Sequence, residues 1–329
     1  MNGVIVIDKP AGWTSHDVVN RMRRILQQRA VGHLGTLDPL ATGVLPLVTG
    51  SLTRLAQFYI ASEKTYEGVI RFGFATNTYD ADGEPVGEVS LATPNLDNLQ
   101  KLAAEFVGQI EQVPPPFSAK KIKGIPAYKL ARKEKEVILK AVQVEVKEFT
   151  ITSVEANRAQ FRAHVSSGTY MRSIAHEMGQ RLGCGAHLES LRRTSVAEFD
   201  VTQAHTLEEI DEKQIEGQRI ELQTIANCPS DRSLAFARGK GSAVEEPVVG
   251  GASPLADLFV HPRQLLPQLP SVTADEATAA RIRSGRPVNL PELSRARQVK
   301  VFCGQRDLVA IATRVARTLF HPKIVFPCD

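Results

Sequence analysis

The sequence has little that would support a disulfide framework, a structural zinc site or export. Its four cysteines lie far apart and none belongs to a CxxC pair. Cys184 and His187 stand three residues apart, but no second pair of ligand types lies near them, so no metal site is expected. The opening MNGVIVIDKPAGWTSHD has no basic segment before an apolar one, which predicts a first strand and a cytoplasmic location.

Long apolar runs and nucleotide-binding loops are lacking as well. No run approaches the roughly 18 apolar residues that span a bilayer, so no membrane association is expected. Neither a GxxxxGK(S/T) nor a GxGxxG motif occurs, which leaves ATP and dinucleotide chemistry without support. The 329 residues are 43% hydrophobic and 23% charged, an ordinary globular composition that is sufficient for two domains.

Positive charge is concentrated in one short stretch. Between Lys120 and Lys140 there are eight Lys or Arg residues against two Glu, a net excess of six, whereas the whole chain carries +4. A local basic block is typical of a protein that binds a polyanion. A solvated lysine-rich loop has the same composition, so charge alone leaves both interpretations open.

Apolar periodicity predicts an alternation of strands and helices. Strands are predicted at 4–7, 64–74, 144–151, 159–165, 298–302, 308–315 and 323–326. Helices are predicted from a cap at Ser15, at 170–182 and at 186–193. The Gly and Pro content predicts a loop at 32–50, and small, turn-forming residues at 211–254 indicate an insertion or a flexible connection. The last sixty or so residues indicate a small β-rich domain.

Asp38 is the most suggestive single residue, although its neighbours alone do not assign it a role. An Asp before a proline is usually a turn former whose side chain bonds nearby backbone. Gly35 and Gly43 also allow close approach of a ligand, and a carboxylate on a stiff loop can be a nucleophile or stabilise charge. Tyr66 and Arg172, taken singly, have equally ordinary structural interpretations.

Several long blocks, taken together and in order, resemble the TruB-type tRNA pseudouridine-55 synthases. The blocks are IDKPAGWTSHDVV, GHLGTLDPLATGVLPL, KTYEGVIRFGFATNTYDADGE, QVPPPFSAKKIKGIPAYKLAR and SSGTYMRSIAHEMGQRLGCGAHLESLRRTSVAEF. VKVFCG and HPKIVF resemble parts of a PUA-like tail, whereas 211–254 does not match. The resemblance implies an α+β fold: a pseudouridine synthase catalytic core in 1–255, with a central mixed or antiparallel β-sheet flanked by helices, and a small β-rich PUA-like RNA-binding domain in 256–329.

The resemblance also implies a role for each matching residue. Asp38 would be the catalytic aspartate, Arg172 its partner, and Tyr66 a group that packs on the target base and assists proton removal. The substrate-binding residues would be His33, Lys64, Tyr170 and Leu191, with His33 filling the stack vacated by the target nucleotide. An RNA-clamping loop at about 114–135 would present Lys120, Lys121, Lys123, Lys129 and Arg132.

The implied reaction is isomerisation of uridine to pseudouridine at position 55, in the T arm of tRNA. The N-glycosidic bond breaks and the uracil rejoins through carbon, so no redox change occurs and no cofactor is expected. The carboxylate would act as a covalent nucleophile or stabilise positive charge at the sugar, and the sequence leaves both open. The expected partner is the T-arm stem-loop, bound by a monomer without an obligatory protein partner. Two alternatives are a tRNA-binding or tRNA-folding module without required catalysis, and a guide-RNA-dependent synthase.

Overall fold

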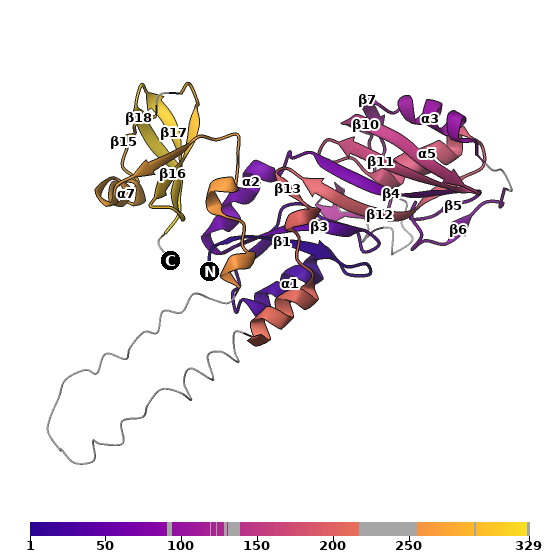
Figure 1. Ribbon diagram of the computed structural model, residues 1–329. Helices are drawn as coiled ribbons and strands as arrows, with labels where there is room; N and C mark the ends of the chain where they lie inside the picture. The colour runs from indigo at the N-terminus through magenta and orange to yellow at the C-terminus, as the bar shows by residue number, and fades with distance from the viewer. Residues whose placement is uncertain are drawn as a thin grey trace, which may run out of the picture.

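Two β-sheets organise the protein in its computed structural model (Figure 1). The structure describes residues 1–90, 94–118, 120–122, 124–127, 130, 139–216, 255–292 and 294–327. The larger sheet has the order β1-β3-β12-β4-β11-β10-β7, with β2 paired to β3 and β13 to β12. Its strands are β1 (Gly3–Lys9), β2 (Val31–His33), β3 (Thr42–Thr49), β4 (Lys64–Phe72), β7 (Gly108–Gln112), β10 (Val142–Glu155), β11 (Arg158–Val165), β12 (Ala186–Val196) and β13 (Phe199–Asp200).

The smaller sheet lies beside the larger one and has the order β14-β16-β17-β18-β15. Its strands are β14 (Ser271–Ala274), β15 (Val288–Asn289), β16 (Gln298–Cys303), β17 (Asp307–Ala316) and β18 (Leu319–Val325). Two short hairpins complete the described strands: β5 (Ala75–Thr76) with β6 (Pro85–Val86), and β8 (Lys121–Ile122) with β9 (Ile125–Pro126). In the large sheet β3 and β12 pair in parallel and the other described pairs are antiparallel, so the predicted mixed sheet is confirmed.

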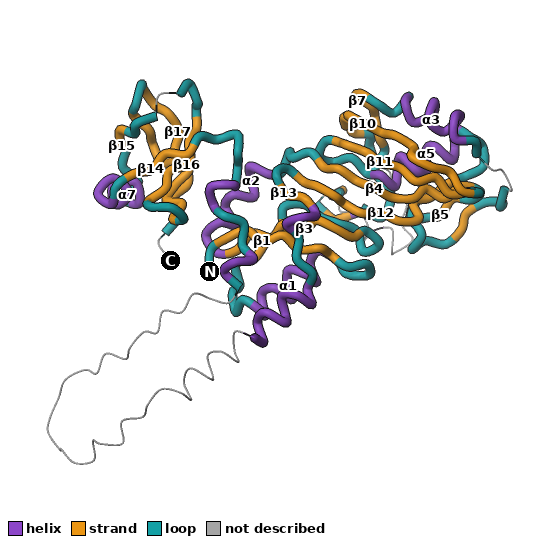
Figure 2. The backbone as a smooth tube through the Cα atoms, viewed as in Figure 1, coloured by secondary structure: helices purple, strands orange, loops and turns teal. Residues whose placement is uncertain are grey.

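Helices cover the large sheet and add one layer to the small one (Figure 2). The α-helices are α1 (Ser15–Ile25), α2 (Ala56–Tyr59), α3 (Leu96–Ala104), α5 (Met171–Arg181) and α7 (Glu276–Arg283), and residues 207–216 are helical too. The 3-10 turns are η1 (Gly50–Leu55), η2 (Val201–Gln203), η3 (Ala256–Leu258) and η4 (Pro262–Gln264). Within the described ranges, no helix has both the length and the apolar character that crossing a membrane requires.

Strand β1 is buried on both faces, which explains its unbroken apolar run. Ile5 and Ile7 belong to the core that α1, α3 and α5 form on the large sheet. Val4 and Val6 belong to a second core, which extends to residues of the C-terminal sheet such as Phe302. The large sheet and the C-terminal sheet therefore share a continuous apolar contact.

The predicted loop at 32–50 is wrong where β3 runs through it. Gly and Pro misled the prediction because both have specific places in this strand. A side chain at Gly43 would collide with the carbonyl oxygen of Arg193 on β12, so the parallel contact requires glycine. Pro46 uses its carbonyl instead of an N–H group and accepts a hydrogen bond from the Leu34 amide at 2.9 Å.

The predicted helix at 186–193 is wrong as well, because these residues belong to β12. The strand pairs with β4 along its length, but register shifts at Leu188/Ser190 and Arg193/Ser195 interrupt its alternation. Those irregularities conceal the two-residue period from which a strand is predicted. The helix predicted at 170–182 is confirmed as α5. Each of the remaining predicted strands overlaps an observed strand.

Two predicted segments are described only in part. Of the stretch 211–254, residues 211–216 lie in a helix that packs on α1, with an Arg21–Asp211 ion pair of 2.5 Å, and 217–254 lie outside the described residues. Residues 255–266 return to the large sheet, where Phe259 bridges Ile5, and the small sheet begins at Ser271. The small sheet thus starts about fifteen residues after the boundary predicted at 255/256.

Candidate active site

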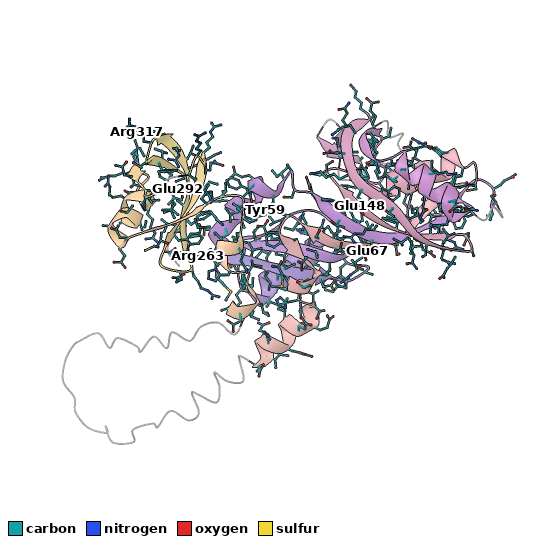
Figure 3. The ribbon with its side chains drawn as sticks, turned by 45° about the horizontal axis from the view of Figure 1, so that its top comes forward. Tyr59, Glu67, Glu148, Arg263, Glu292 and Arg317 are labelled. Atoms are coloured by element: carbon teal, nitrogen blue, oxygen red, sulfur yellow. The ribbon has the colours of Figure 1, made fainter. Side chains whose placement is uncertain are left out.

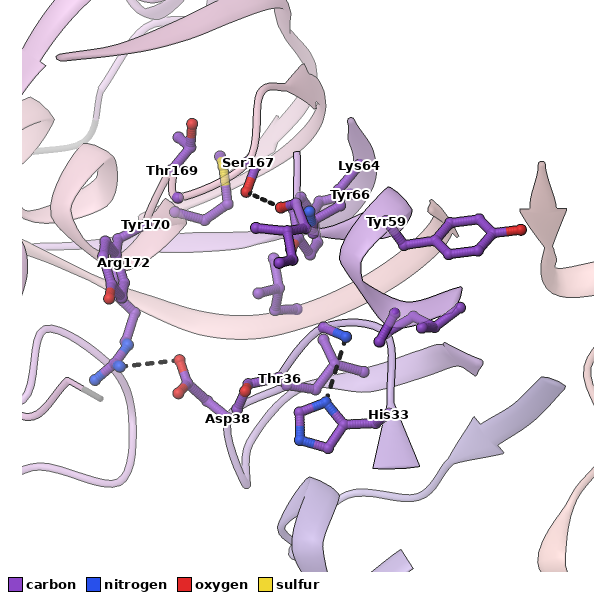
Figure 4. Close-up of a pocket in the computed structure, with 18 residues that line it drawn as sticks. His33, Thr36, Asp38, Tyr59, Lys64, Tyr66, Ser167, Thr169, Tyr170 and Arg172 are labelled. Carbon is purple, nitrogen blue, oxygen red and sulfur yellow. Dashed lines mark hydrogen bonds and ion pairs between the residues drawn. The ribbon is translucent and has the colours of Figure 1, made fainter. Parts of the chain in front are cut away.

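A cavity of about 400 Å³ opens between the loop that carries Asp38, helix α2, strand β4 and the start of α5 (Figure 4). This volume is within the range of small-molecule and single-nucleotide pockets. Every residue to which the sequence assigned catalysis or base binding lines it: His33, Asp38, Lys64, Tyr66, Tyr170, Arg172 and Leu191. Residues from distant parts of the chain therefore converge on one site.

The backbone on either side of Asp38 is fixed by buried polar side chains. The Ser15 hydroxyl bonds to both the N–H (2.8 Å) and the carbonyl (3.1 Å) of Leu37. Lys9, which is fully buried, donates from Nζ to the Pro39 carbonyl at 3.2 Å. Ser15 is therefore not the helix cap that the sequence predicts. Thr14 caps α1, and Ser15 holds the loop instead.

Arg193 holds the same loop from the side of the sheet. Its side chain is fully buried and donates to the carbonyls of Gly35 (3.0 Å), Thr36 (3.3 Å) and Val44 (2.8 Å). It also hydrogen-bonds the Tyr66 hydroxyl, although burial of the guanidinium lowers the pKa of Arg193. Because one side chain contacts both the loop and Tyr66, it fixes their relative position.

Arg172 connects Asp38 to a second, buried carboxylate. Its guanidinium lies 2.9 Å from Asp38 Oδ2 and 3.2 Å from Asp80 Oδ2, and it donates to the carbonyls of Thr78 and Phe117. The side chains of Arg172 and Asp80 are 5% and 7% exposed, whereas that of Asp38 is 39% exposed and faces the cavity. The arginine is thus fixed from behind, and only Asp38 is open to a ligand.

Opposing influences act on the Asp38 carboxyl group. Burial raises its pKa, Arg172 lowers it, and the nearby Asp80 raises it again, so the pKa ends above its ordinary value. Lys9, whose own pKa burial lowers to about 8, also favours the ionised carboxylate. Arg172 and Lys9 therefore offset only part of the effect of burial, and the protonated form is favoured more than in a free aspartate.

Tyr66 and Leu191 form the floor of the cavity on neighbouring strands. Tyr66 on β4 is 7% exposed, and burial raises the pKa of its hydroxyl, which keeps its proton near neutral pH. Leu191 on β12 is partly buried opposite Gly68 and presents an apolar wall. Lys64, at the start of β4, donates to the Ser62 carbonyl, and burial lowers its pKa to about 8.

Tyr170 joins the cavity to the base of the predicted RNA-clamping loop. Its backbone exchanges two hydrogen bonds with the Gln112 side chain, at 2.8 and 3.1 Å, and burial raises the pKa of its hydroxyl. Of the basic residues predicted for this loop, Lys120 is exposed and the backbone of Lys121 lies in β8. Lys123, Lys129 and Arg132 lie outside the described residues.

His33 lies at the rim, on the opposite side of Asp38 from Arg172 (Figure 4). Burial, followed by the charge of Arg193, lowers the pKa of its imidazole, so the ring is neutral near pH 7. The Gly35 amide donates to Nδ1 at 3.3 Å, which assigns the ring proton to Nε2. A neutral, planar ring at this rim is suited to stacking on a base.

The sequence prediction missed three buried ionic residues of the site. Asp80, Lys9 and Arg193 all lie within the resembling blocks, but each looks like an ordinary surface residue in the sequence. Their burial at 5%, 0% and 0% exposure is what distinguishes them, and burial of a charge is not visible in local sequence. No cluster of three or more His, Cys, Asp or Glu able to hold a metal occurs among the residues that the structure describes.

The fold is shared with chains in two solved structures. The chain superposes with a TM-score of 0.62 on a structure titled "Crystal Structure of a Cbf5-Nop10-Gar1 Complex", at 24% identity, covering 96% of this chain and 79% of that one. The TM-score is 0.65 for "Structure of H/ACA RNP bound to a substrate RNA containing 2'-deoxyuridine", at 21% identity over 99% of this chain and 86% of that one. At these identities the likeness shows the fold alone.

Sequence comparison places the chain in the pseudouridylate synthase class. Residues 23–171 match the family model "TruB family pseudouridylate synthase (N terminal domain)", and 172–227 match "tRNA pseudouridylate synthase B C-terminal domain". The tRNA pseudouridine synthase B of Solibacter usitatus (strain Ellin6076) is 47% identical over 330 residues, covering 99% of this chain and 100% of that protein. That of Aquifex aeolicus (strain VF5) is 46% identical over 211 residues, covering 64% and 73%. The chain belongs to the TruB family of pseudouridylate synthases.

Proposed function

We propose that this chain isomerises uridine to pseudouridine at position 55, in the T arm of tRNA, with Asp38 as the catalytic carboxylate. The observation that best supports this proposal is the Asp38–Arg172 ion pair at 2.9 Å. The carboxylate faces a nucleotide-sized cavity, and the arginine is buried behind it. The names of the relatives support tRNA as the substrate. The test is to incubate the pure chain with one unmodified tRNA and to map the modified nucleotide.

The cavity residues have complementary roles in this proposal. The target uridine is extruded from the folded loop, and Leu191 and Tyr66 hold its base against the floor while His33 fills the vacated stack. Asp38 attacks the sugar carbon or stabilises its positive charge as the glycosidic bond breaks, and Arg172 keeps the carboxylate ionised. Tyr170 lines the wall, Lys64 borders the base, and Tyr66 assists proton removal. The reaction is an isomerisation, so the proposal needs neither cofactor nor metal.

The same assay with a bare T-arm hairpin as substrate decides between this proposal and its alternatives. We infer catalysis by residues 1–255 and RNA binding by a PUA-like domain at 256–329, in a cytoplasmic monomer that needs no protein partner. The insertion expected at 211–254 overlaps the match to the C-terminal family model at 172–227, so we confine that proposal to 228–254. Pseudouridine formed by the chain alone on a bare T-arm hairpin supports all the catalytic elements of this proposal. Dependence on a guide RNA, or tight binding with no product, would favour the guide-dependent or the non-catalytic alternative.

The pH dependence of the catalytic rate should reflect the raised pKa of Asp38. Because the carboxylate must be ionised, activity is lost as the pH falls through that pKa, and the acid limb should lie above the ordinary Asp value of about 3.9. Single-turnover rates between pH 4 and 8, with tRNA binding measured in parallel, would locate the limb. A His33→Gln variant should show the same acid limb. If the limb disappears in that variant, the titrating group is the imidazole and not Asp38.

The basic loop should contribute phosphate contacts. Changing Lys120, Lys121 and Lys123 together to alanine is expected to weaken tRNA binding about tenfold at moderate salt and to reduce the slope of log Kd against log salt by up to about three. Titrations at four salt concentrations would measure the slope. Lys101→Ala, an exposed lysine on α3, is the matched control and should leave it unchanged. An unaltered slope in the triple variant would remove the loop from the RNA interface.

A further inference from the structure

Tyr59 lines the cavity and also makes a hydrogen bond outside it. The residue ends α2, is 2% exposed and lines the cavity. Its hydroxyl points away from Asp38 (Figure 4) and donates to Glu198 Oε1 at 2.5 Å. Glu198 lies in the turn between β12 and β13, next to Phe199, whose ring packs on Tyr59 at 5.6 Å. The hydroxyl therefore belongs to a structure outside the cavity.

The same carboxylate oxygen holds the chain segment that leads to the C-terminal sheet. We call residues 262–269 the strap. The Leu266 amide of the strap donates to Glu198 Oε1 at 2.8 Å, and it lies 3.2 Å from the Tyr59 hydroxyl. Leu266 is 1% exposed and has a φ of 51°, a left-handed conformation that costs a leucine energy unless its surroundings enforce it. The three groups form a partly buried joint at one point of the strap.

The C-terminal sheet holds the other side of the strap. Lys300 on β16 is 2% exposed, and its Nζ donates to the carbonyls of Leu265 at 2.6 Å and Arg263 at 2.9 Å. The Arg263 guanidinium lies over the Phe302 ring at 4.5 Å and donates to the Gly304 carbonyl at 2.9 Å. Figure 3 places Tyr59 and Arg263 between the two sheets. Polar contacts thus fix the strap to both domains, where a free linker would have none.

The C-terminal domain that follows the strap is strongly basic. Residues 271–327 contain ten Lys or Arg and four Asp or Glu, a net charge of +6 against +4 for the whole chain. Such an excess favours contact with a polyanion. Seven of the ten cations are exposed, and we expect an RNA longer than the T-arm stem-loop to reach them.

We propose that Glu198 is a positioning residue that fixes the basic C-terminal domain at a set orientation to the catalytic cavity, so that one tRNA contacts both at once. The inference rests on the proposed function. Two binding surfaces held in a matching geometry strengthen binding through effective concentration, and that gain is lost when the joint between them loosens. The joint therefore acts on substrates that are long enough to reach both surfaces, and not on the chemical step.

The test compares two substrates on one variant pair. Glu198→Ala removes the acceptor that Tyr59 and Leu266 share, whereas Glu198→Gln keeps an oxygen in its place. With full-length tRNA, Glu198→Ala should raise KM about five- to twentyfold at unchanged kcat, and Glu198→Gln should restore KM to within about threefold. With a T-arm hairpin, both variants should match the wild type within about twofold. Gln57→Ala, on the exposed side of α2, is the control.

Each outcome decides the question. If Glu198→Ala loses the same catalytic efficiency on the hairpin as on tRNA, the joint only supports the fold or the cavity. If its KM on tRNA is unchanged, the joint does not position the domain. Either result overturns the inference. If Glu198→Ala is not recovered folded, Glu198→Asp, which withdraws the carboxylate by one methylene, must show the same dependence on substrate length. A wild-type chain inactive on both substrates would overturn the proposed function instead.

Discussion

Asp38→Asn is expected to reduce single-turnover pseudouridine formation by at least about a thousandfold. Asparagine has nearly the same shape, and its oxygen can still accept a hydrogen bond from Arg172 Nη2, which lies 2.9 Å from the carboxylate in the native site. It cannot carry the negative charge, so it neither bonds to the sugar carbon nor stabilises a cation there. Both mechanisms left open by the sequence therefore predict the same loss.

The affinity for tRNA should change less than about threefold in this variant, because the cavity keeps its shape. Filter binding and a single-turnover assay on the same preparation would separate the two effects. Asp97→Asn, an exposed residue of the first turn of α3, is the matched control and should retain full activity. A rate within tenfold of wild type for Asp38→Asn would remove Asp38 from the chemistry.

Arg172→Met is expected to lower the free energy of unfolding by about 3–5 kcal/mol and to abolish measurable turnover. The guanidinium is buried between two carboxylates, and the Asp80 side chain is itself 7% exposed. Methionine fills much of the space but removes the cation with which both carboxylates form ion pairs. Urea unfolding at pH 7.5 gives the change directly.

Two further variants isolate the electrostatic cause. Adding Asp80→Asn to Arg172→Met should recover part of the stability, because one of the uncompensated charges is removed. Arg181→Met, on the same helix, loses ion pairs to Glu177 and Glu105, but its side chain is 40% exposed and the loss should be about 1 kcal/mol or less. Equal losses for Arg172 and Arg181 would contradict a special role for the buried pair.

The sequence predicts the fold well where one face of an element is buried. The strands around Tyr66 and Phe161 alternate regularly, and α5 repeats apolar residues at Ile174 and Met178. Prediction fails where tertiary contact sets the conformation. Gly43 looks like a loop residue until the neighbouring strand is present, and the bulges of β12 exist only in its pairing with β4.

The candidate site could be predicted because long blocks of the sequence resemble a known family. The spacing of the site residues along the chain would not have predicted it. Asp38 and Arg172 are 134 positions apart, and no local pattern states that they meet. The buried ions Lys9, Asp80 and Arg193 escaped the prediction because their importance lies in their surroundings. A lysine or arginine is normally solvated, and only a three-dimensional structure shows which of them has lost its water.

The two-sided burial of β1 couples parts of the chain that are far apart in sequence. Val4 and Val6 share a core with Ile324 and Phe326, which stand more than 300 positions later, whereas Ile5 and Ile7 on the other face belong to the core beneath the catalytic cavity. A substitution that enlarges or empties the first core is therefore expected to lower the stability of both sheets together, because one strand contributes to each.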